Sequence, residues 1–408
     1  MRKTIAVLFV VVCMVSMTGC GGSSSATTVT NYTVVPTTTV LPASVPGTKL
    51  GGAIQGSPLS FTNYSVSTFA GSSAGFSNYT STANVSAMFN RPIAVTTDGT
   101  NLYVADYLNN AIRQINIVTQ HVTTIGNANG LAGSADTAAG TPSFNLPRDI
   151  TTDGTNLYVA DSGNYTIRQI VIATGVVTTI AGAAGQAGSV DSPIGSNARF
   201  NVINGITTDG FNLYVTDSNN TIRRIALSGT LPVTTLAGAP GTTGSADGVQ
   251  GDARFNVPNR LTTDGPNLYV TDFSNSTIRK IVLATGVVST IAGVVEPGGA
   301  TGQDVDSASG QNARFNQPNG ITTDGTNLYV TDSYNHEIRM IVLPAPGAVY
   351  SGAVTTIAGG STGSAGGSTD GRGAVATFNK PIGITTDGTC LYIADNQNHR
   401  IRKIQRGL

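Results

Sequence analysis

Tryptophan is absent from the sequence, and charged residues make up only 11% of it. An ordinary soluble domain is about 25% charged, and exposed helices are built largely from Lys, Arg, Glu and other strong helix formers. The shortage argues against a charged helical architecture, and the missing tryptophan excludes repeat families that carry a Trp signature. The 22 basic and 22 acidic residues cancel, so no net charge attracts nucleic acid or an anionic membrane.

The amino-terminal residues are expected to form a signal peptide over 1–19 rather than part of the fold. A basic start is followed by an apolar run at 5–12, which is too short to span a bilayer as a permanent helix. Residues 17–20, Met-Thr-Gly-Cys, resemble the lipobox of bacterial lipoproteins, which implies lipidation of Cys20. Gly21 stands where inner-membrane retention would require Asp, which implies the outer membrane, with the domain either periplasmic or surface-exposed. An ordinary signal peptide with a chance cysteine is the alternative.

Cysteine is scarce, and its positions are consistent with export and with lipidation of Cys20. Cys13 leaves with the signal, Cys20 takes the lipid and Cys390 remains alone, so no disulfide is expected in the exported domain. Cys390 fills a position that is Asn in the other repeats described below, which favours a packed thiol over a nucleophile. Residues 20–60 are rich in Gly, Ser, Thr and Pro and predict a flexible tether. The folded domain is expected over 61–408.

A repeat of about 55 to 63 residues occupies most of this domain. Each copy begins with Thr-Thr-Asp-Gly and continues through a Leu-Tyr segment that ends in Asp to an Ile-Arg segment. Asp-Gly, Asn and Gly turn signals separate four short runs rich in Val, Ile, Thr and Tyr, and no run has helical length or period. Each unit is therefore predicted to be a four-stranded antiparallel meander. The turn aspartates of the six copies are Asp98, Asp153, Asp209, Asp264, Asp324 and Asp387.

The second strand of each unit is apolar on both alternating faces, so both faces must be covered. A sheet packed between two neighbours meets this requirement, which predicts an all-β, six-bladed β-propeller of four-stranded antiparallel blades. The last copy ends after its third strand at 401–404, and the missing fourth strand has its match at 64–71, before the first copy. The N-terminal strand is therefore expected to complete the C-terminal blade and close the ring. An open stack would need polar end caps instead.

The repeat resembles the NHL repeat. The similarity to bacterial secreted members rests on Gly-Ser-Ala-Asp-Gly at 244–248, Ala-Arg-Phe-Asn at 253–256 and the Asp-Gly, Leu-Tyr-Val-Thr-Asp and Ile-Arg segments that follow, and it covers 64–408. The resemblance implies the propeller fold but says little about function, because that family includes scaffolds, RNA binders, sensor domains and a metal-dependent lyase. RNA binding is disfavoured by the balanced charge and by export.

Charged residues that recur in every unit are expected to be structural. Each second strand ends in Asp and each third strand carries Arg, and buried charges are normally paired. Asp–Arg pairs inside the blades are therefore favoured over a ring of carboxylates that binds cations. The predicted pairs are Asp106 with Arg113, Asp161 with Arg168, Asp217 with Arg223, Asp272 with Arg279, Asp332 with Arg339 and Asp395 with Arg402.

Departures from the repeat indicate a candidate binding face. The loop into the first strand and the turn between the second and third strands lie at the same end of a meander, and both vary, whereas the opposite turns are short and uniform. The varying residues are expected to rim the mouth of the central channel as a ligand-binding set, and a solvated surface with incidental aromatics is the alternative. The set is Arg148, Asp149 and Arg260 in the loops and Tyr107, Tyr165, Phe273, Tyr334, His336, Gln397 and His399 in the turns.

Histidine is too scarce to favour an enzyme. The sequence holds only His121, His336 and His399, whereas resemblance to the NHL-type lyase would require several histidines that converge on the channel. His336 and His399 occupy equivalent turns of adjacent units and could hold one metal such as Zn²⁺. Loop acids such as Asp304 and Asp306 could suggest Ca²⁺, but their spacing follows no known calcium loop. No cofactor and no catalytic residue are therefore expected.

These features favour a non-enzymatic envelope lipoprotein. Its variable face would bind a protein, peptide or glycan partner, with no nucleic acid, and only its lipid anchor would contact the membrane. The alternative is a secreted lyase or hydrolase that acts at the central channel, with or without a metal.

Overall fold

The computed structural model describes Leu59 and residues 64–78, 87–127, 129–139, 141–295, 304–344, 352–360 and 366–406. All of them belong to the unit Ser44–Leu408. The predicted signal peptide, Cys20 and, apart from Leu59, the predicted tether lie outside the described residues. Among the described residues, no helix is long and apolar enough to span a membrane.

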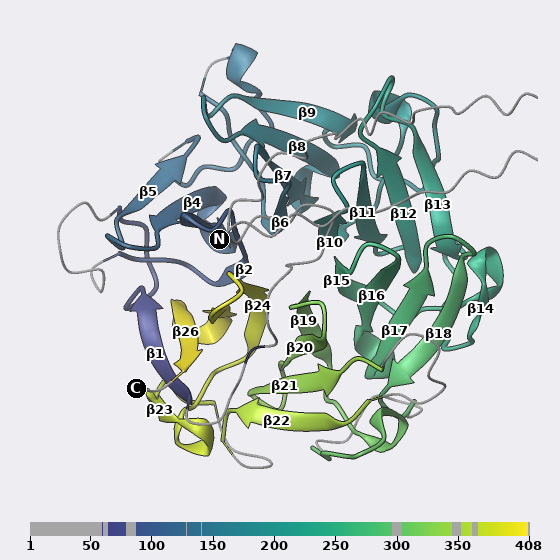
Figure 1. The fold of residues 1–408 in the computed structure, drawn as a ribbon. Helices are drawn as coiled ribbons and strands as arrows, with labels where there is room; N and C mark the ends of the chain where they lie inside the picture. Colours follow the sequence, from purple (N-terminus) through teal and green to yellow (C-terminus); the bar gives the residue numbers. More distant parts are fainter. Residues whose placement is uncertain are drawn as a thin grey trace, which may run out of the picture. The chain divides into compact units, whose positions relative to one another are not determined.

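Six antiparallel sheets are arranged as blades around a central axis (Figure 1). The innermost strands of blades 1 to 6 are β2 (Pro92–Thr97), β6 (Pro147–Thr152), β10 (Ile203–Thr208), β15 (Pro258–Thr263), β19 (Pro318–Thr323) and β24 (Pro381–Thr386). The second strands are β3 (Asn101–Asp106), β7 (Asn156–Asp161), β11 (Asn212–Asp217), β16 (Asn267–Asp272), β20 (Asn327–Asp332) and β25 (Leu391–Asp395). The third strands are β4 (Ala111–Asn116), β8 (Thr166–Val171), β12 (Thr221–Ala226), β17 (Thr277–Val282), β21 (Glu337–Val342) and β26 (Arg400–Arg406). The outermost strands are β5 (Val122–Ile125), β9 (Val177–Gly182), β13 (Val233–Gly238), β18 (Val287–Ala292), β22 (Val354–Ala358) and, in blade 6, β1 (Tyr64–Ala70).

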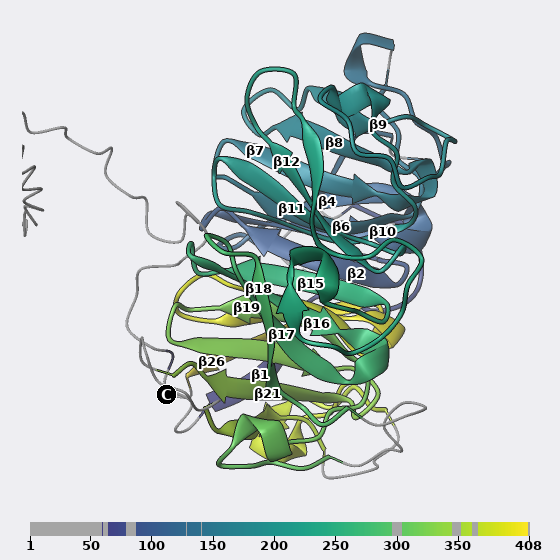
Figure 2. The same ribbon diagram turned by 90° about the vertical axis from the view of Figure 1, so that its right-hand side faces the viewer.

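The ring is closed by the two ends of the repeat region, as the sequence predicts. β1 pairs antiparallel with β26, with Val66 opposite Ile404 and Ser67 opposite Lys403. Figure 1 shows β1, in purple, beside the yellow β26, and Figure 2 shows the same neighbours from the side. Each innermost strand also contacts the innermost strand of the next blade, from β2 round to β24 and back to β2.

Two blades have a fifth, two-residue strand that the repeat pattern does not predict. β14 (Gly248–Val249) pairs with β18, and β23 (Gly371–Arg372) pairs with β1. The residue before each short strand is a loop aspartate that accepts a backbone hydrogen bond from the outermost strand, Asp247 from Thr290 and Asp370 from Thr68. This anchor lays the loop along the strand edge.

The core consists of layers between adjacent blades. Leu102 and Val104 of β3 pack with Tyr392 of blade 6, whereas Tyr103 and Ala105 of the same strand pack toward blade 2. The second strand is thus buried on both faces, as its two-sided apolar pattern indicates. Full burial of one such aliphatic side chain contributes about 1.5–3 kcal/mol.

Short 3-10 helices shape the loops. Four of them form the turn between the second and third strands, and the others lie in the connections between blades. The first group is η2 (Tyr107–Asn109), η4 (Ser162–Asn164), η7 (Phe273–Asn275) and η10 (Asn396–Asn398), and the second is η3 (Thr137–Ala139), η5 (Gly195–Asn197), η6 (Gln250–Asp252), η8 (Gly310–Asn312) and η9 (Gly373–Val375).

Candidate ligand-binding site

The arginines of the third strands bind the blades together and do not face the channel. In blade 2, the buried Arg168 lies with Nη1 2.9 Å from Asp161 Oδ2 and donates to the carbonyl of Ser143. Its guanidinium lies over the ring of Phe144, 5.2 Å from the centroid. Burial raises the pKa of Asp161 to about 6, although Arg168 and hydrogen-bond donors to the carboxylate oppose the shift. The six predicted Asp–Arg pairs are all present, at 2.8–3.1 Å.

The loop acids that could suggest calcium contact these same arginines. Asp136 accepts from Arg168 Nη2 at 2.7 Å and from the backbone and hydroxyl of Thr179 on the outermost strand. In blade 1 the equivalent position is Asn78, which accepts from Arg113. The loop acids bonded in this way are Asp136, Asp191, Asp247, Asp306 and Asp370.

Two rings of residues from the innermost strands surround the channel near the variable face. The upper ring lies at that face, and the deeper ring lies beneath it. The deeper ring is mostly small because neighbouring backbones approach closely there: a Cβ on Gly320 would lie 2.0 Å from the carbonyl oxygen of Ile382. The upper ring is Ile93, Arg148, Asn204, Asn259, Asn319 and Ile382, and the deeper ring is Ala94, Asp149, Gly205, Arg260, Gly320 and Gly383.

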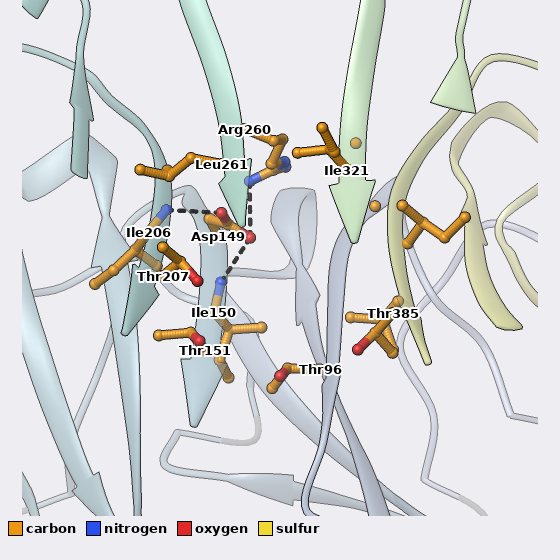
Figure 3. Close-up of a pocket in the computed structure, with 14 residues that line it drawn as sticks. Thr96, Asp149, Ile150, Thr151, Ile206, Thr207, Arg260, Leu261, Ile321 and Thr385 are labelled. Carbon is orange, nitrogen blue, oxygen red and sulfur yellow. Dashed lines mark hydrogen bonds and ion pairs between the residues drawn. The ribbon is translucent and has the colours of Figure 1, made fainter. Parts of the chain in front are cut away.

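Asp149 and Arg260 close the channel. Both side chains are buried, and Arg260 Nη1 lies 2.9 Å from Asp149 Oδ1 across the axis (Figure 3). Arg260 also donates to the carbonyls of Asn204 and Ile93, at 2.8 and 2.9 Å. Burial raises the pKa of Asp149 and lowers that of Arg260, and the attraction between the two charges opposes both shifts. The remaining space beside the pair is about 30 Å³, which is room for about one water molecule.

Above this closure lies an open cavity of about 320 Å³ on the variable face. Arg148 donates to Asn204 Oδ1 at 2.9 Å, and its guanidinium carbon lies 5.7 Å from the ring centroid of Tyr107. None of the residues that line the cavity carries a carboxylate, so Arg91 and Arg148 make the mouth positive. The lining residues are Arg91, Ile93, Tyr107, Arg148, Asn204, Val257, Asn259, Arg260, Phe273, Asn319, Ile382 and Asn396.

The structure brings together only part of the predicted ligand-binding set. Tyr107, Arg148, Arg260 and Phe273 line the mouth, and Asp149 lies beneath it, bonded to Arg260. The remaining members of the set, which do not line the cavity, are Tyr165, Tyr334, His336, Gln397 and His399.

Arg91 and the asparagines of the upper ring were not predicted from the sequence. Alignment of the six Phe-Asn-x segments would have shown that Arg91 is one of two cations at that position, the other being Lys380. The asparagines recur in three blades, so they do not stand out as departures from the repeat.

The two histidines form contacts between consecutive blades. His336 Nδ1 accepts from the backbone N–H of Lys380 at 2.9 Å, and His399 Nδ1 accepts from that of Arg91 at 3.0 Å. Asn110 Oδ1 plays the same part between blades 1 and 2. An accepting Nδ1 must be unprotonated, and burial, with Lys380 and Arg91 nearby, lowers the pKa of both imidazoles. One of the two ring nitrogens of each histidine is thus engaged in the fold.

Tyr334 and Cys390 have local contacts of their own. Tyr334 packs edge-to-face with Phe273 at 6.4 Å, and the Lys380 ammonium lies 4.3 Å from its ring centroid. Cys390 is buried and free, and burial raises the pKa of its thiol. The packed thiol is what its position in the turn predicts.

Sequence comparison with known proteins supports the resemblance of the repeat to the NHL repeat. No protein-family model matches the chain. The chain is 29% identical over 354 residues to NHL repeat-containing protein 2 of Gallus gallus, covering 77% of this chain and 46% of that protein. It is 30% identical over 298 residues to the Homo sapiens protein of the same name, covering 64% of this chain and 39% of that protein. The chain thus spans less than half the length of these curated relatives.

Solved structures share the architecture at lower identity. A protein of unknown function from Bacteroides thetaiotaomicron VPI-5482 has a TM-score of 0.62 at 23% identity, covering 84% of this chain and 76% of that one. An auxiliary nutrient binding protein from Bacteroides ovatus ATCC 8483 has a TM-score of 0.60 at 19% identity, with the same coverage. At these identities the likeness shows the fold alone.

The blades and their closure define the protein as a six-bladed β-propeller. The sequence matches, taken with that architecture, support the NHL-repeat β-propeller family.

Proposed function

We propose that this protein is a cell-envelope NHL-repeat lipoprotein that acts as a non-enzymatic binding module, with its ligand held at the channel mouth. The observation that carries the proposal is the convergence of Arg91, Tyr107, Arg148 and Phe273, from blades 1, 2 and 4, on one cavity above a closed channel. These blades are not all neighbours, so only the closed ring assembles the set.

The mouth has the composition of a site for an anionic group. Guanidinium groups recognise carboxylates and phosphates with several donors in a fixed plane, and the surrounding asparagines add neutral hydrogen-bonding groups. Tyr107 and Phe273 supply aromatic surface next to Arg148. A cavity of about 320 Å³ falls within the usual size of small-ligand sites, about 300–1,000 Å³. The partner is therefore expected to present an acidic group, as the carboxylate of a peptide or of an acidic sugar does.

The channel lining favours binding over catalysis. Neither the mouth nor the closed channel is lined by His, Cys or Glu, and the one carboxylate, Asp149, is bonded to Arg260. A lyase or hydrolase needs a base or nucleophile within reach of its substrate. The description of the Bacteroides ovatus protein as an auxiliary nutrient binding protein is compatible with a binding role here.

A capture experiment tests the binding site. Immobilised wild-type protein, the Arg91→Gln/Arg148→Gln double variant and an Arg224→Gln control would be incubated with envelope extract. Arg224 is an exposed arginine of β12 that does not line the mouth. Hydrogen bonds to charged groups contribute about 1.5–3 kcal/mol each, so the double variant should retain at least about tenfold less partner than the control. Equal retention, or no partner retained by the wild type, would contradict the proposal.

The envelope location depends on Cys20 and is tested separately. Wild-type protein expressed in a bacterial host should partition into detergent and yield a lipid-modified N-terminal peptide in mass spectra. Cys20→Ser should move to the aqueous phase. An unmodified wild-type Cys20 would refute lipidation while leaving the binding site open to the capture experiment.

A further inference from the structure

Blade 5 has two acidic departures from the repeat. Asp304 lies two residues before the loop acid Asp306, and Glu337 begins the third strand β21. At the position of Asp304 the other blades have Phe76, Ser134, Ser189, Ser245 and Ser368, and at that of Glu337 they have Ala111, Thr166, Thr221, Thr277 and Arg400. The two departures are far apart in the sequence and occur in the same blade.

The fold places Asp304 and Glu337 next to Asp332, the aspartate that ends the second strand and has an equivalent in every blade. Asp304, Asp332 and Glu337 each place a carboxylate oxygen within 4.8 Å of the other two. Arg339 Nη1 lies 2.9 Å from Asp332 and 2.6 Å from Asp304. The three carboxylates therefore share one buried volume with a single guanidinium.

Glu337 supplies the second observation. The residue is only 1% exposed, and its Oε2 has no hydrogen-bond donor among the described residues, while the side chain faces the carboxyl group of Asp304, with which it can share a proton. A buried carboxylate oxygen without a donor is costly, and elsewhere in the blades buried carboxylates are paired. The orphaned oxygen of Glu337 lies in the one blade that has gained two acids, which points to a positively charged ligand.

The net charge of the cluster in blade 5, compared with that of blade 4, also favours a bound cation. In blade 4, Arg279 contacts Asp247 and Asp272, which leaves a net charge of −1. In blade 5, Arg339 contacts Asp304, Asp306 and Asp332, and Glu337 adds a fourth carboxyl group, so the net charge of these groups is −3 when all four meet a cation as carboxylates. One divalent cation restores the balance found in blade 4.

An ion can reach the cluster from solvent. A cavity of about 300 Å³ is lined by Asp304, Asp306 and Glu337 together with Tyr64 and Gly360. The side chain of Asp306 is 47% exposed, so the cavity meets the surface beside it.

We propose that Asp304, Asp332 and Glu337 bind a divalent cation of the hard, oxygen-preferring class, Ca²⁺, in blade 5. All three ligands are carboxylate oxygens and none is a nitrogen or sulfur atom, which favours Ca²⁺ over Zn²⁺. Water from the adjoining cavity completes the coordination. In the absence of the ion, burial and the neighbouring Asp304 raise the pKa of Glu337 above its ordinary value.

The test is calorimetric titration of CaCl₂ into purified, chelator-treated full-length protein near neutral pH. The wild type should bind one Ca²⁺ per chain at this site, and the Asp304→Ser/Glu337→Thr double variant should lose that binding. Both substitutions restore residues that other blades carry at these positions, so the variant is expected to fold, which circular dichroism checks. Asp252→Ser, which removes an exposed acid from the loop of blade 4, should bind as the wild type does. No Ca²⁺ binding by the wild type, or equal binding by the double variant, overturns the proposal, and neither result bears on the channel mouth.

Discussion

The closure of the channel can be tested by removing either half of the Asp149–Arg260 pair. Arg260→Ala removes a buried guanidinium that donates to Asp149 and to two carbonyls, and it leaves Asp149 buried without its counter-ion. Breaking a buried ion pair from one side costs about 3–5 kcal/mol. Arg260→Ala is therefore expected to lower the free energy of unfolding by that amount.

The reciprocal and double variants separate the pair from its surroundings. Asp149→Ala should also cost about 3–5 kcal/mol, because Arg260 loses its counter-ion and the N–H of Ile206 loses its acceptor. The double variant leaves no unpaired charge, and alanine already occupies the equivalent position in blade 1 as Ala94. The double variant should therefore cost about 2–3 kcal/mol less than the two single effects combined.

Urea-induced unfolding of the four proteins measures these free energies. An Arg224→Ala control, at an exposed position, should stay within about 0.5 kcal/mol of the wild type. The reasoning is refuted if Arg260→Ala costs less than about 1 kcal/mol, or if the two single effects add within about 0.5 kcal/mol.

Two further predictions concern contacts between blades. The folded state lowers the pKa of His336 and His399, so wild-type stability should fall as pH drops from about 6.5 toward the lowered values, by about 0.5–1.5 kcal/mol for each lost hydrogen bond. Replacing both by Asn, which fills this position in blades 1 and 3, should keep stability near neutral pH and reduce the acid sensitivity in thermal unfolding; an unchanged pH profile would contradict the hydrogen-bond role. Gly320→Ala should destabilise the protein by about 3 kcal/mol or more because its Cβ would overlap a backbone carbonyl oxygen. Gly251→Ala, which meets nothing within 4 Å, is the control, and equal melting temperatures would argue against the close approach of the innermost strands.

The architecture was accessible from the sequence because each of its determinants is local or repeated. The two-sided apolar pattern of strands such as β3 required covered faces, and the fourth-strand sequence at 64–71 supplied what the last copy lacked. The short strands β14 and β23 gave no such signal, since two residues carry no periodicity.

The site was only partly accessible, because contacts across the axis are not encoded in strand patterns. Asp149 and Arg260 were visible as departures from a small-residue position, and Arg148 as a departure from a position that is Asn or Ile elsewhere. Asp149 and Arg260 belong to blades that are not adjacent, so their pairing required the closed ring. His336 and His399 were recognised as equivalent turns. Their acceptor role depends on a backbone N–H of the next blade that no sequence pattern marks.

Pairing of β1 with β26 is the central claim, because the mouth exists only if blades 1 and 6 are neighbours. Ser67 lies opposite Lys403, and directly opposed residues of an antiparallel pair place their Cα atoms about 4.5–5.5 Å apart, which is within the range that a disulfide spans. Oxidation of a Ser67→Cys/Lys403→Cys variant should give an intramolecular disulfide between these two peptides in mass spectra. The control variant Ser67→Cys/Lys280→Cys, with the second cysteine at the matching position of blade 4, should give none. Absence of the first cross-link, or its formation only between chains, would contradict ring closure.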